Sequence, residues 1–543
     1  MRKLCEILLP MLLCLAPLAA SAQSFRVQCP TSTITHPTAG NNNSEPAYAG
    51  PTTLASGPKG FLVPSANVNG AIKCQQISGG DGYATMGDGT QTYMFSFGPL
   101  SGLGDIASGQ PGTEYPNVFN TVYSGATPLQ PGDPATTGVI YNGAVGLAYD
   151  VDANLGSGTT GAPIDGHVDP RPIMDVGVMN GNIPAPMMAI DEDDEFFLTL
   201  TNVGMIMRPD LFEQHTVHFH GYPNASAFYD GVPDASVAIN IGASFTYYYL
   251  APDAGTYFWH CHITPPEHLQ MGMVGQLYVR PRQDRVTGSL YAALSNQQGD
   301  LRTACPSFTD TVHSDILCSN PLPAGGATAN TATGAATVLN GGTSGYAYND
   351  GDGSTYYDVE YPMQIHGFDP NFHFVGMTFN PEGFTDMKDK YFLLNGRSYP
   401  DTVGGSVDAL GNVVPGPMQT QSADGVNHFS QPLPAIISIP AGKKALLRIS
   451  DLDVSEYQTL ASLGIPMKVI GYNAKLLRDQ AGINMYYTTN SITLGGGESL
   501  DVILDATGYT AGSVFYLYTP NLDHLSNDAE NFGGLMTEVR ITN

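Results

Sequence analysis

The feature that most constrains this chain is a cysteine between two histidines, Cys261, within the strand-like segment 255–263. A third histidine, His268, follows seven residues after the cysteine, and Met273 follows five residues after that histidine. A second cluster lies upstream and consists of His215, His218 and His220. Six of the thirteen histidines therefore fall in two short stretches. A lone buried histidine or cysteine is usually structural, but this density of ligands indicates a metal site.

Both stretches are rich in Thr, Val, Phe, Tyr and Trp, which predicts that they form strands. Side chains alternate between the two faces of a strand, so Cys261 points away from its two histidine neighbours. The same alternation places His215 opposite the other two upstream histidines. If the strands are neighbours, one face carries Cys261 and His215. The opposite face then carries four histidines: His218, His220, His260 and His262.

The cysteine face predicts a type 1 (blue) copper site. Such sites use two histidines, one cysteine and a long axial methionine. We expect the ligands to be His215, Cys261, His268 and Met273, with Met271 as a rival for the axial position. The four-histidine face predicts a cage for one or more further copper ions, and we expect its histidines to be the catalytic residues.

The order and spacing of motifs from about residue 180 to residue 280 resemble the first cupredoxin domain of the multicopper oxidases. The motifs that match are 180–186, 218–221, 230–233 and 255–260. A type 1 ligand set in a first domain is similar to two-domain laccase-like proteins and to copper nitrite reductases. The gap from Cys261 to His268, which contains Pro265 and Pro266, is longer than in the common laccase pattern.

The C-terminal part of the chain resembles the second domain of the same family at residues 392–397, 445–450 and 497–502. It contains no His-x-His pair, and its histidines are isolated in the sequence: His366, His373, His428 and His524. We therefore expect a cupredoxin-like domain without a type 1 copper of its own.

The predicted fold is all-β, with tandem cupredoxin-like Greek-key β-sandwiches and a loop-rich N-terminal extension. Gly and Pro are abundant, and charged residues make up only 13% of the chain, which is typical of a β-rich protein with long loops. The predicted organisation is a signal peptide at 1–22, a loop-rich region at 23–168 wrapped on domain 1, cupredoxin domain 1 at 169–282, a linker or insertion at 283–356, and domain 2 at 357–543.

The N-terminus predicts export. A basic start precedes an apolar run over residues 7–20, and Ala20-Ser21-Ala22 offers a small-residue cleavage site. No other run predicts a membrane span, so we expect a periplasmic or extracellular protein. His36 and His167 are isolated, and we expect both at the surface. The net charge of −28 argues against nucleic acid and anionic membranes as partners.

Five cysteines lie beyond the predicted signal peptide: Cys29, Cys74, Cys261, Cys305 and Cys318. The predicted copper thiolate of Cys261 must stay unpaired. The others could form the bridges Cys29–Cys74 and Cys305–Cys318, as an oxidising compartment permits.

Three functions fit the sequence. One is a multicopper-oxidase-like enzyme that takes electrons from a phenol or a reduced metal ion and passes them to oxygen. A second is a nitrite-reductase-like enzyme with a type 2 copper on His220 and His260, completed by a neighbouring subunit of a homotrimer, with His524 as the candidate third ligand. The third is a non-catalytic blue-copper electron carrier. The oxygen-reducing cluster of the oxidases takes four His-x-His pairs, whereas this chain has two.

Overall fold

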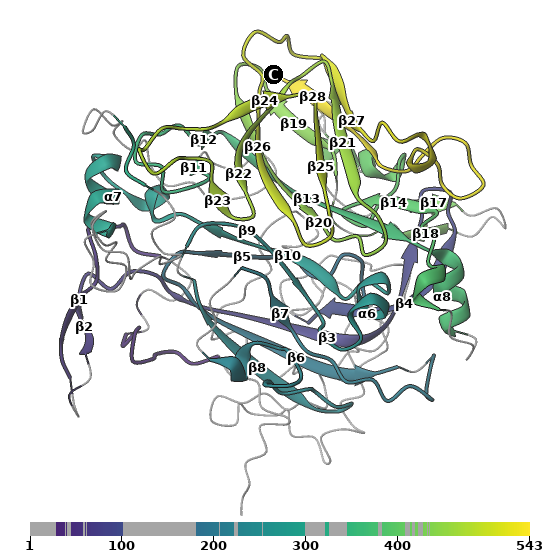
Figure 1. Cartoon of the computed structure of the whole chain (residues 1–543), viewed down its shortest axis with the longest axis horizontal. Helices are drawn as coiled ribbons and strands as arrows, with labels where there is room; N and C mark the ends of the chain where they lie inside the picture. The colour runs from purple at the N-terminus through teal and green to yellow at the C-terminus, as the bar shows by residue number, and fades with distance from the viewer. Residues whose placement is uncertain are drawn as a thin grey trace, which may run out of the picture.

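The computed structural model describes residues 29–100, 181–298, 321–324, 345–377 and 383–543. Short gaps within these ranges fall at 39, 41–44, 58–59, 61, 206, 222–225, 252, 405, 408–412, 415–418, 422–426, 430, 432 and 434. The predicted signal peptide, His167 and the predicted Cys305–Cys318 bridge lie outside the described residues. The described part is mostly strands packed into two β-sandwiches, which confirms the all-β prediction (Figure 1).

Domain 1 is a sandwich of two four-stranded sheets. One sheet has the order β4 (Gln91–Pro99), β3 (Ile72–Thr85), β6 (Glu195–Gly204), β8 (Ser244–Leu250). The other has the order β5 (Met188–Asp191), β10 (Val274–Arg280), β9 (Gly255–His260), β7 (His218–Phe219). A hairpin of β1 (Thr53–Ser56) and β2 (Leu62–Ala66) lies apart from both. Strands β3 and β4 come from the predicted loop-rich region, so that region supplies half of one sheet rather than only wrapping around the domain.

The two sheets of domain 1 enclose an aromatic core. Along β9, Tyr257 and Trp259 point into this core, and Cys261 follows on the same side. Trp259 is fully buried and stacks on Phe97 of β4, with the ring centroids 5.3 Å apart. A side chain at Gly275 on the neighbouring strand would come within 2.9 Å of the indole, so glycine leaves room for it. The period-2 alternation of β9 therefore fixes which face Cys261 occupies.

Domain 2 is the second sandwich and lies above domain 1 in Figure 1. Its larger sheet has the order β14 (Tyr391–Leu394), β13 (Val359–Phe368), β20 (Lys444–Asp451), β26 (Ser499–Asp505), β22 (Met467–Tyr472), β23 (Lys475–Leu476), and β24 (Tyr487–Thr489) pairs with β22. The other has the order β19 (Ile437–Pro440), β28 (Met536–Thr542), β27 (Val514–Tyr518), β21 (Gln458–Leu463), β25 (Ser491–Leu494). An aliphatic core fills the space between them.

Short helices and small strands join these sheets. The α-helices are α6 (Pro265–Gln270), α7 (Leu290–Gln298) and α8 (Pro370–Met377), and the 3-10 helices are η3 (Ala227–Tyr229), η4 (Arg282–Arg285), η6 (Phe384–Asp386), η7 (Asp401–Val403) and η8 (Leu522–His524). The small strands are β11 (Gly345–Tyr346), β12 (Tyr356–Tyr357), β15 (Ser406–Val407), β16 (Val413–Val414), β17 (Gln419–Gln421) and β18 (Asn427–Phe429). In the described part, no helix is both long and apolar enough to cross a membrane.

Part of the predicted linker is packed structure. Helix α7 buries Leu290 and Leu294, and the segment around β11 is buried against domain 1. There the Asn349 amide donates to both carboxylate oxygens of Glu192, at 2.8 and 2.7 Å. The described ends of this region therefore join the two domains through buried polar contacts.

The domains meet through a buried polar interface. Glu360 of β13 accepts hydrogen bonds from Arg280 of β10 at 3.3 Å and from Arg448 of β20 at 3.0 Å. Thr256 of β9 donates to Asp501 of β26 at 2.7 Å. Buried charges of this kind need partners. The Arg280 and Thr256 contacts cross the interface, and Arg448 supports the Glu360 carboxylate from within domain 2. They hold the face of β9 that carries His260 against domain 2.

The N-terminal segment is tied down at two points. Cys29 and Cys74 form a disulfide, as predicted. The prediction that His36 lies at the surface is wrong, because its ring is only 3% exposed. Nδ1 lies 2.6 Å from the Glu195 carboxylate, and Nε2 lies 2.9 Å from the Asn69 carbonyl oxygen. His36 is buried because it packs against Glu195, which lies 159 residues later in the chain. The residues next to His36 in the sequence do not indicate this contact.

Candidate metal centres

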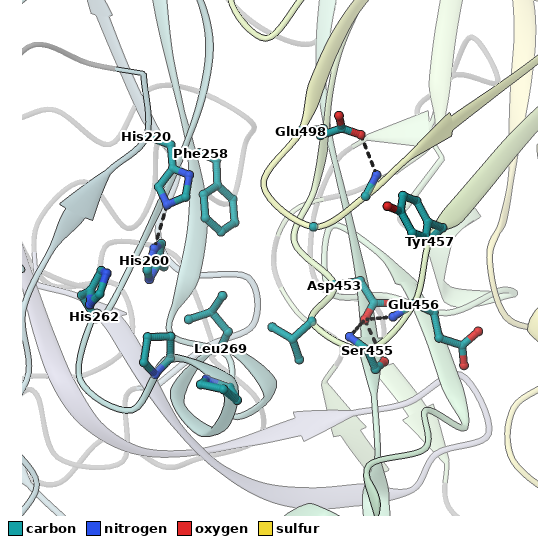
Figure 2. A pocket seen from close by; sticks show the side chains of 15 residues that line it. His220, Phe258, His260, His262, Leu269, Asp453, Ser455, Glu456, Tyr457 and Glu498 are labelled. Atoms are coloured by element: carbon teal, nitrogen blue, oxygen red, sulfur yellow. Dashed lines mark hydrogen bonds between the residues drawn. The ribbon is translucent and has the colours of Figure 1, made fainter. Parts of the chain in front are cut away.

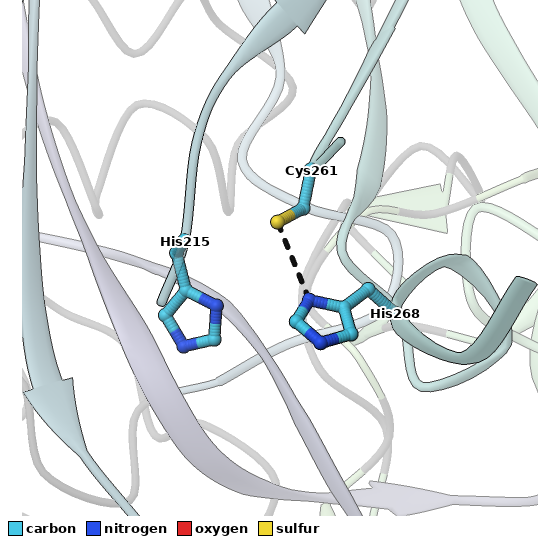
Figure 3. Close-up of side chains that lie close together, drawn as sticks. All are labelled: His215, Cys261 and His268. Atoms are coloured by element: carbon cyan, nitrogen blue, oxygen red, sulfur yellow. Dashed lines mark hydrogen bonds between the residues drawn. The ribbon is translucent and has the colours of Figure 1, made fainter. Parts of the chain in front are cut away.

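The structure brings His215, Cys261 and His268 together (Figure 3). Strand parity predicted the first two on one face, and the spacing after Cys261 predicted His268. One ligand atom from each side chain lies within 4.8 Å of the other two. His215 is held by a two-way backbone bridge to Ile239, Cys261 follows β9, and His268 lies on α6. His268 Nδ1 is 3.3 Å from Cys261 Sγ. Three separate chain segments thus aim two imidazoles and a thiol at one point.

The surroundings of this first centre suit a metal ion. His215, Cys261 and His268 are all fully buried. Among the residues that the structure describes, neither ring nitrogen of His215 has a hydrogen-bond partner. A buried polar group without a partner is costly, and an ion bound to the ring would remove that cost. The Cys261 sulfur accepts the Thr216 N–H at 3.4 Å and forms no disulfide. Two imidazoles and one thiolate are the equatorial donor set of a blue copper site.

The two imidazoles of this centre have opposite pKa shifts. Burial lowers the pKa of His215 well below its ordinary value, and the neighbouring His268 lowers it further. Burial would also lower the pKa of His268, but the Cys261 thiol, Glu213 and Glu267 outweigh it and raise that pKa to about 9. Glu213 Oε2 lies 3.7 Å from His268 Nε2, and its side chain is 28% exposed. Glu213 therefore links a buried ring to solvent.

Helix α6 explains the long gap between Cys261 and His268. Thr264 adopts a left-handed conformation (φ 38°), and two prolines then occupy the first positions of the helix. Proline suits these positions because the N–H groups of the first turn have no helical partner. The extra residues thus form a helical turn that returns His268 to the sulfur. Met271 and Met273 lie in the same core cluster as Cys261, and the Cys261 N–H donates to the Met273 carbonyl at 3.0 Å.

The second predicted group also assembles. Ligand atoms of His218, His220 and His260 lie within 4.8 Å of one another. The ring centroid of His262 is 5.1 Å from that of His218 and 5.4 Å from that of His260. His218 Nδ1 donates to the Asp230 carbonyl at 2.7 Å, and His260 Nδ1 donates to the Cys261 carbonyl at 2.6 Å. These contacts leave the Nε2 atoms of both rings available as ligands.

The charge state of this four-histidine face also suits a cation. His220 Nε2 and His260 Nε2 point at each other across 2.9 Å. Burial, followed by the neighbouring histidines, lowers the pKa of His220 to about 4. Burial lowers the pKa of His260 to about 3, and the same neighbours add to the shift. The two rings are therefore neutral at ordinary pH, with lone pairs that a metal ion could use.

A cavity of about 700 Å³ separates this face from domain 2 (Figure 2). Histidines line one side, and domain 2 supplies the other side. The domain 2 residues with polar or aromatic side chains are Asp453, Ser455, Glu456, Tyr457 and Glu498. Sequence reasoning missed these carboxylates, because no motif relates them to histidines roughly two hundred residues earlier. The role of Glu213 beside the first centre was only weakly indicated by the sequence, in which it lies two residues before His215.

The structure contradicts the prediction that His524 is a third ligand at this face. His524 is only 3% exposed and stacks on Phe392 inside domain 2, with ring centroids 3.8 Å apart. Its Nδ1 lies 2.9 Å from Gln458 Oε1, and its Nε2 lies 3.1 Å from Glu456 Oε2. Both nitrogens are thus engaged within domain 2 and the ring is buried, which is the environment of a structural histidine rather than of a ligand at the surface. The side chain of His428 lies outside the described residues.

Comparisons with known proteins agree with the first-domain resemblance. Residues 165–284 match the multicopper oxidase family. The chain is 32% identical over 126 residues to laccase abr2 of Aspergillus fumigatus, which covers 23% of this chain and 20% of that protein. It is also 32% identical over 114 residues to a copper-containing nitrite reductase of Rhizobium meliloti, covering 20% of this chain and 27% of the relative. The match thus spans about a fifth to a quarter of these curated relatives.

Residues 165–284 therefore match a multicopper oxidase domain, in agreement with the motifs. Solved structures that align with the chain include the blue copper oxidase from Nitrosomonas europaea. That alignment covers 87% of this chain and 86% of the other, with a TM-score of 0.45 and 16% identity. A copper nitrite reductase from Nitrosomonas europaea aligns over 87% of this chain and 94% of its own, with a TM-score of 0.41 and 11% identity.

Proposed function

We propose that this protein is an exported copper-dependent oxidoreductase of the multicopper oxidase type. The observation that carries the proposal is the pair of ligand clusters on opposite sides of one strand end. Cys261 belongs to the first cluster, and its neighbours His260 and His262 belong to the second. Copper bound at such clusters supplies one-electron transfer and the activation of oxygen. The covalent path from the Cys261 side chain to the side chain of His260 or His262 crosses only one peptide bond.

The first cluster is suited to receiving electrons. His215, Cys261 and His268 would hold the type 1 copper, and Met273 would be a further ligand from the same core cluster. Their aromatic and aliphatic surroundings exclude water from the site. A reductant would approach at Glu213, the partly exposed group beside His268. Contact with His268 lowers the pKa of Glu213, so its carboxylate is ionised and placed to accept the proton that an oxidised phenol releases.

The second cluster is suited to holding the electron acceptor. His218, His220, His260 and His262 would hold further copper, and the last three of them line the cavity. Reduction of oxygen to water consumes protons, and Asp453 and Glu456 face the cavity from domain 2. Asp453 belongs to a hydrogen-bond chain that runs through Gln458 to His524. These residues could hold and move protons beside the site without being ligands.

Two other functions fit the same clusters. In the described part of the chain, domain 2 presents carboxylates rather than His-x-His pairs to the cavity. A nitrite-reductase-like enzyme with one further copper needs fewer histidines and is the second candidate, and a blue-copper electron carrier is the third. A homotrimer would allow a neighbouring subunit to complete the site. Export is supported by the predicted signal peptide and by the Cys29–Cys74 disulfide, which forms in oxidising compartments.

Copper content separates these functions. We expect purified protein, loaded with excess copper and then desalted, to show an intense thiolate-to-copper absorption band and more than one copper per chain. About four ions would fit a full oxidase and about two a nitrite-reductase-like enzyme. One ion under copper excess would leave only the electron carrier. Absence of the band in the loaded protein would rule out the type 1 assignment. Light scattering of the same sample measures whether the protein is a trimer.

A further inference from the structure

We infer that domain 2 acts as a clamp on the segment that follows His268, and that His366 and His373 are positioning residues for the Cys261 centre. The inference rests on the proposed type 1 site for its spectroscopic consequence, but its structural part does not need copper. It gives a role to two histidines that are isolated in the sequence and are no part of either ligand cluster.

The end of α6 lies against two histidines of domain 2. The last carbonyls of a helix have free acceptor capacity, and here the Leu269 carbonyl accepts the Gly272 N–H at 2.9 Å and can accept a second donor. His366 of β13 lies with Nε2 3.0 Å from the Leu269 carbonyl oxygen and with Nδ1 against the Gly367 carbonyl oxygen. A neutral ring donates to only one of them, and we assign its proton to Nε2. His373 of α8 lies with Nε2 3.0 Å from the Gln270 carbonyl oxygen. Two domain 2 rings therefore contact two consecutive carbonyls of the helix end.

Domain 2 also binds the side chain of Gln270. Its Nε2 donates to Asp389 Oδ1 at 3.0 Å, and its Oε1 accepts the Asp369 N–H at 3.1 Å. Gln270 is fully buried, so both ends of its amide need such partners. With the two histidine contacts, four interactions from domain 2 converge on Leu269 and Gln270.

These contacts bear directly on the ligand geometry. Leu269 and Gln270 lie between the proposed ligands His268 and Met273. Helix α6 has only six residues, too few to be stable without tertiary contacts. On the domain 1 side, Phe95 packs edge-on against the His268 ring with centroids 5.1 Å apart. The segment from His268 to Met273 therefore packs between the core of domain 1 and the contacts from His366, His373 and their domain 2 neighbours.

The two clamp histidines are themselves fixed. Both are buried, with at most 1% of their surface exposed. His373 stacks on Phe368 with centroids 3.8 Å apart, and its Nδ1 lies 2.7 Å from the Tyr93 carbonyl oxygen of β4. This ring thus bridges β4 and α6, two segments of domain 1, from its place in domain 2. A change in either ring would be transmitted to the ligand segment, because close-packed interiors leave little room for adjustment.

The test uses full-length His366→Leu and His373→Leu proteins, singly and combined. His366→Gln is the rescue variant because its amide can restore a donor. His36→Leu is the matched control, because His36 is a similarly buried histidine whose ring nitrogens contact Glu195 and Asn69 and no residue of α6. The first readout is the alkylation rate of Cys261 in copper-free, folded protein. Loss of a buried hydrogen bond should raise that rate about tenfold in His366→Leu, and more in the double variant. The rescue and control variants should stay near wild type.

The second readout is the position of the visible band and the copper hyperfine splitting in electron paramagnetic resonance of loaded protein. We expect both to change in the His366→Leu and His373→Leu variants and not in His36→Leu. Unchanged alkylation in the folded double variant overturns the clamp. If the leucine variants do not fold, Gln270→Met removes the Asp389 and Asp369 contacts, and the same rate decides. A wild type without a blue band, together with faster alkylation in the variants, would refute the proposed function and leave the clamp standing.

Discussion

The two ligand clusters begin from adjacent residues of one strand end but lie in opposite environments. The Cys261 cluster is dry, with both imidazoles fully buried beside Phe95 and Phe97. The four-histidine cluster faces a cavity of about 700 Å³. A one-residue step along β9 separates these environments because successive side chains point to opposite faces of the sheet. Strand β9 therefore separates a buried site suited to electron transfer from a site that is open to small molecules.

The clusters also differ in which part of the chain builds them. All three residues of the first cluster belong to domain 1, and domain 2 contacts its surroundings at the end of α6 and at the Tyr93 carbonyl of β4. The second cluster takes its ligands from domain 1 but its cavity wall from domain 2, which supplies the carboxylates of Asp453, Glu456 and Glu498. The second site should therefore depend on domain docking much more than the first.

The largest difference between the two clusters is expected from Cys261→Ser, which removes the thiolate ligand of the first cluster only. The thiolate is the source of the intense visible band, so the band should disappear completely in copper-loaded protein. The second cluster lies on the other side of β9 and should keep its copper. Copper analysis together with electron paramagnetic resonance checks both parts. Loss of all copper would show that the two clusters are not independent sites.

The converse change is the combined His218→Ala and His262→Ala substitution. It should remove the copper of the cavity and leave the blue band in place. Removing a mere supporting partner of a ligand costs about 10–100-fold in activity, so loss of two ligands should cost more. Oxygen uptake with a phenol as reductant measures the activity. His215→Ala is the mirror-image control and should bleach the band while keeping the second copper. An unchanged copper count in the double variant would show that the four histidines hold no metal.

Domain docking is tested by Glu360→Gln. Breaking one partner of a buried ionic network should lower the free energy of unfolding by about 3 kcal/mol, because Arg280 and Arg448 lose their shared carboxylate. Denaturant unfolding measures this cost. Copper in the cavity should be lost more readily than the blue band, since only the cavity is built by both domains. Equal sensitivity of the two sites would refute the difference proposed here.

The same network has a defined pH dependence. Burial alone would raise the pKa of Glu360, but Arg448 and Arg280 outweigh it and lower the pKa. The stabilisation is therefore complete above the unfolded-state pKa of about 4.3 and is lost as the pH falls below it towards the folded-state pKa. Wild-type stability should fall in this acid range more steeply than that of Glu360→Gln, as melting temperatures across the range would show.

The smallest effect on either centre is expected from Cys29→Ala with Cys74→Ala. The disulfide joins the N-terminal segment to β3 across a sequence separation of 45, and neither cysteine belongs to a ligand cluster. Its removal should lower the free energy of unfolding by about 2–4 kcal/mol. The blue band and the copper count should not change. Peptide mapping of wild type should find this bridge, with Cys261 as a free thiol once copper is removed.

The sequence alone determined the local chemistry of this protein. The period of a strand is fixed, so spacing was enough to separate Cys261 from the four histidines and to group it with His215. The motifs around residues 218–221 and 255–260 indicated the family, and the family comparison agrees. The composition and the Gly and Pro content indicated the β fold. These inferences hold because each depends on residues a short distance apart in the chain.

Only the tertiary structure decided what surrounds the two clusters. No spacing rule connects His366 and His373 to the end of α6, or Asp453 to the cavity, because these contacts span roughly a hundred to two hundred residues. The same limit made the expectation for His36 wrong and led His524 to be proposed as a ligand, although Gln458 and Glu456 already occupy its nitrogens. Burial and hydrogen-bond partners are set by packing between segments that are distant in the chain. The sequence of one segment does not indicate against which other segments it packs.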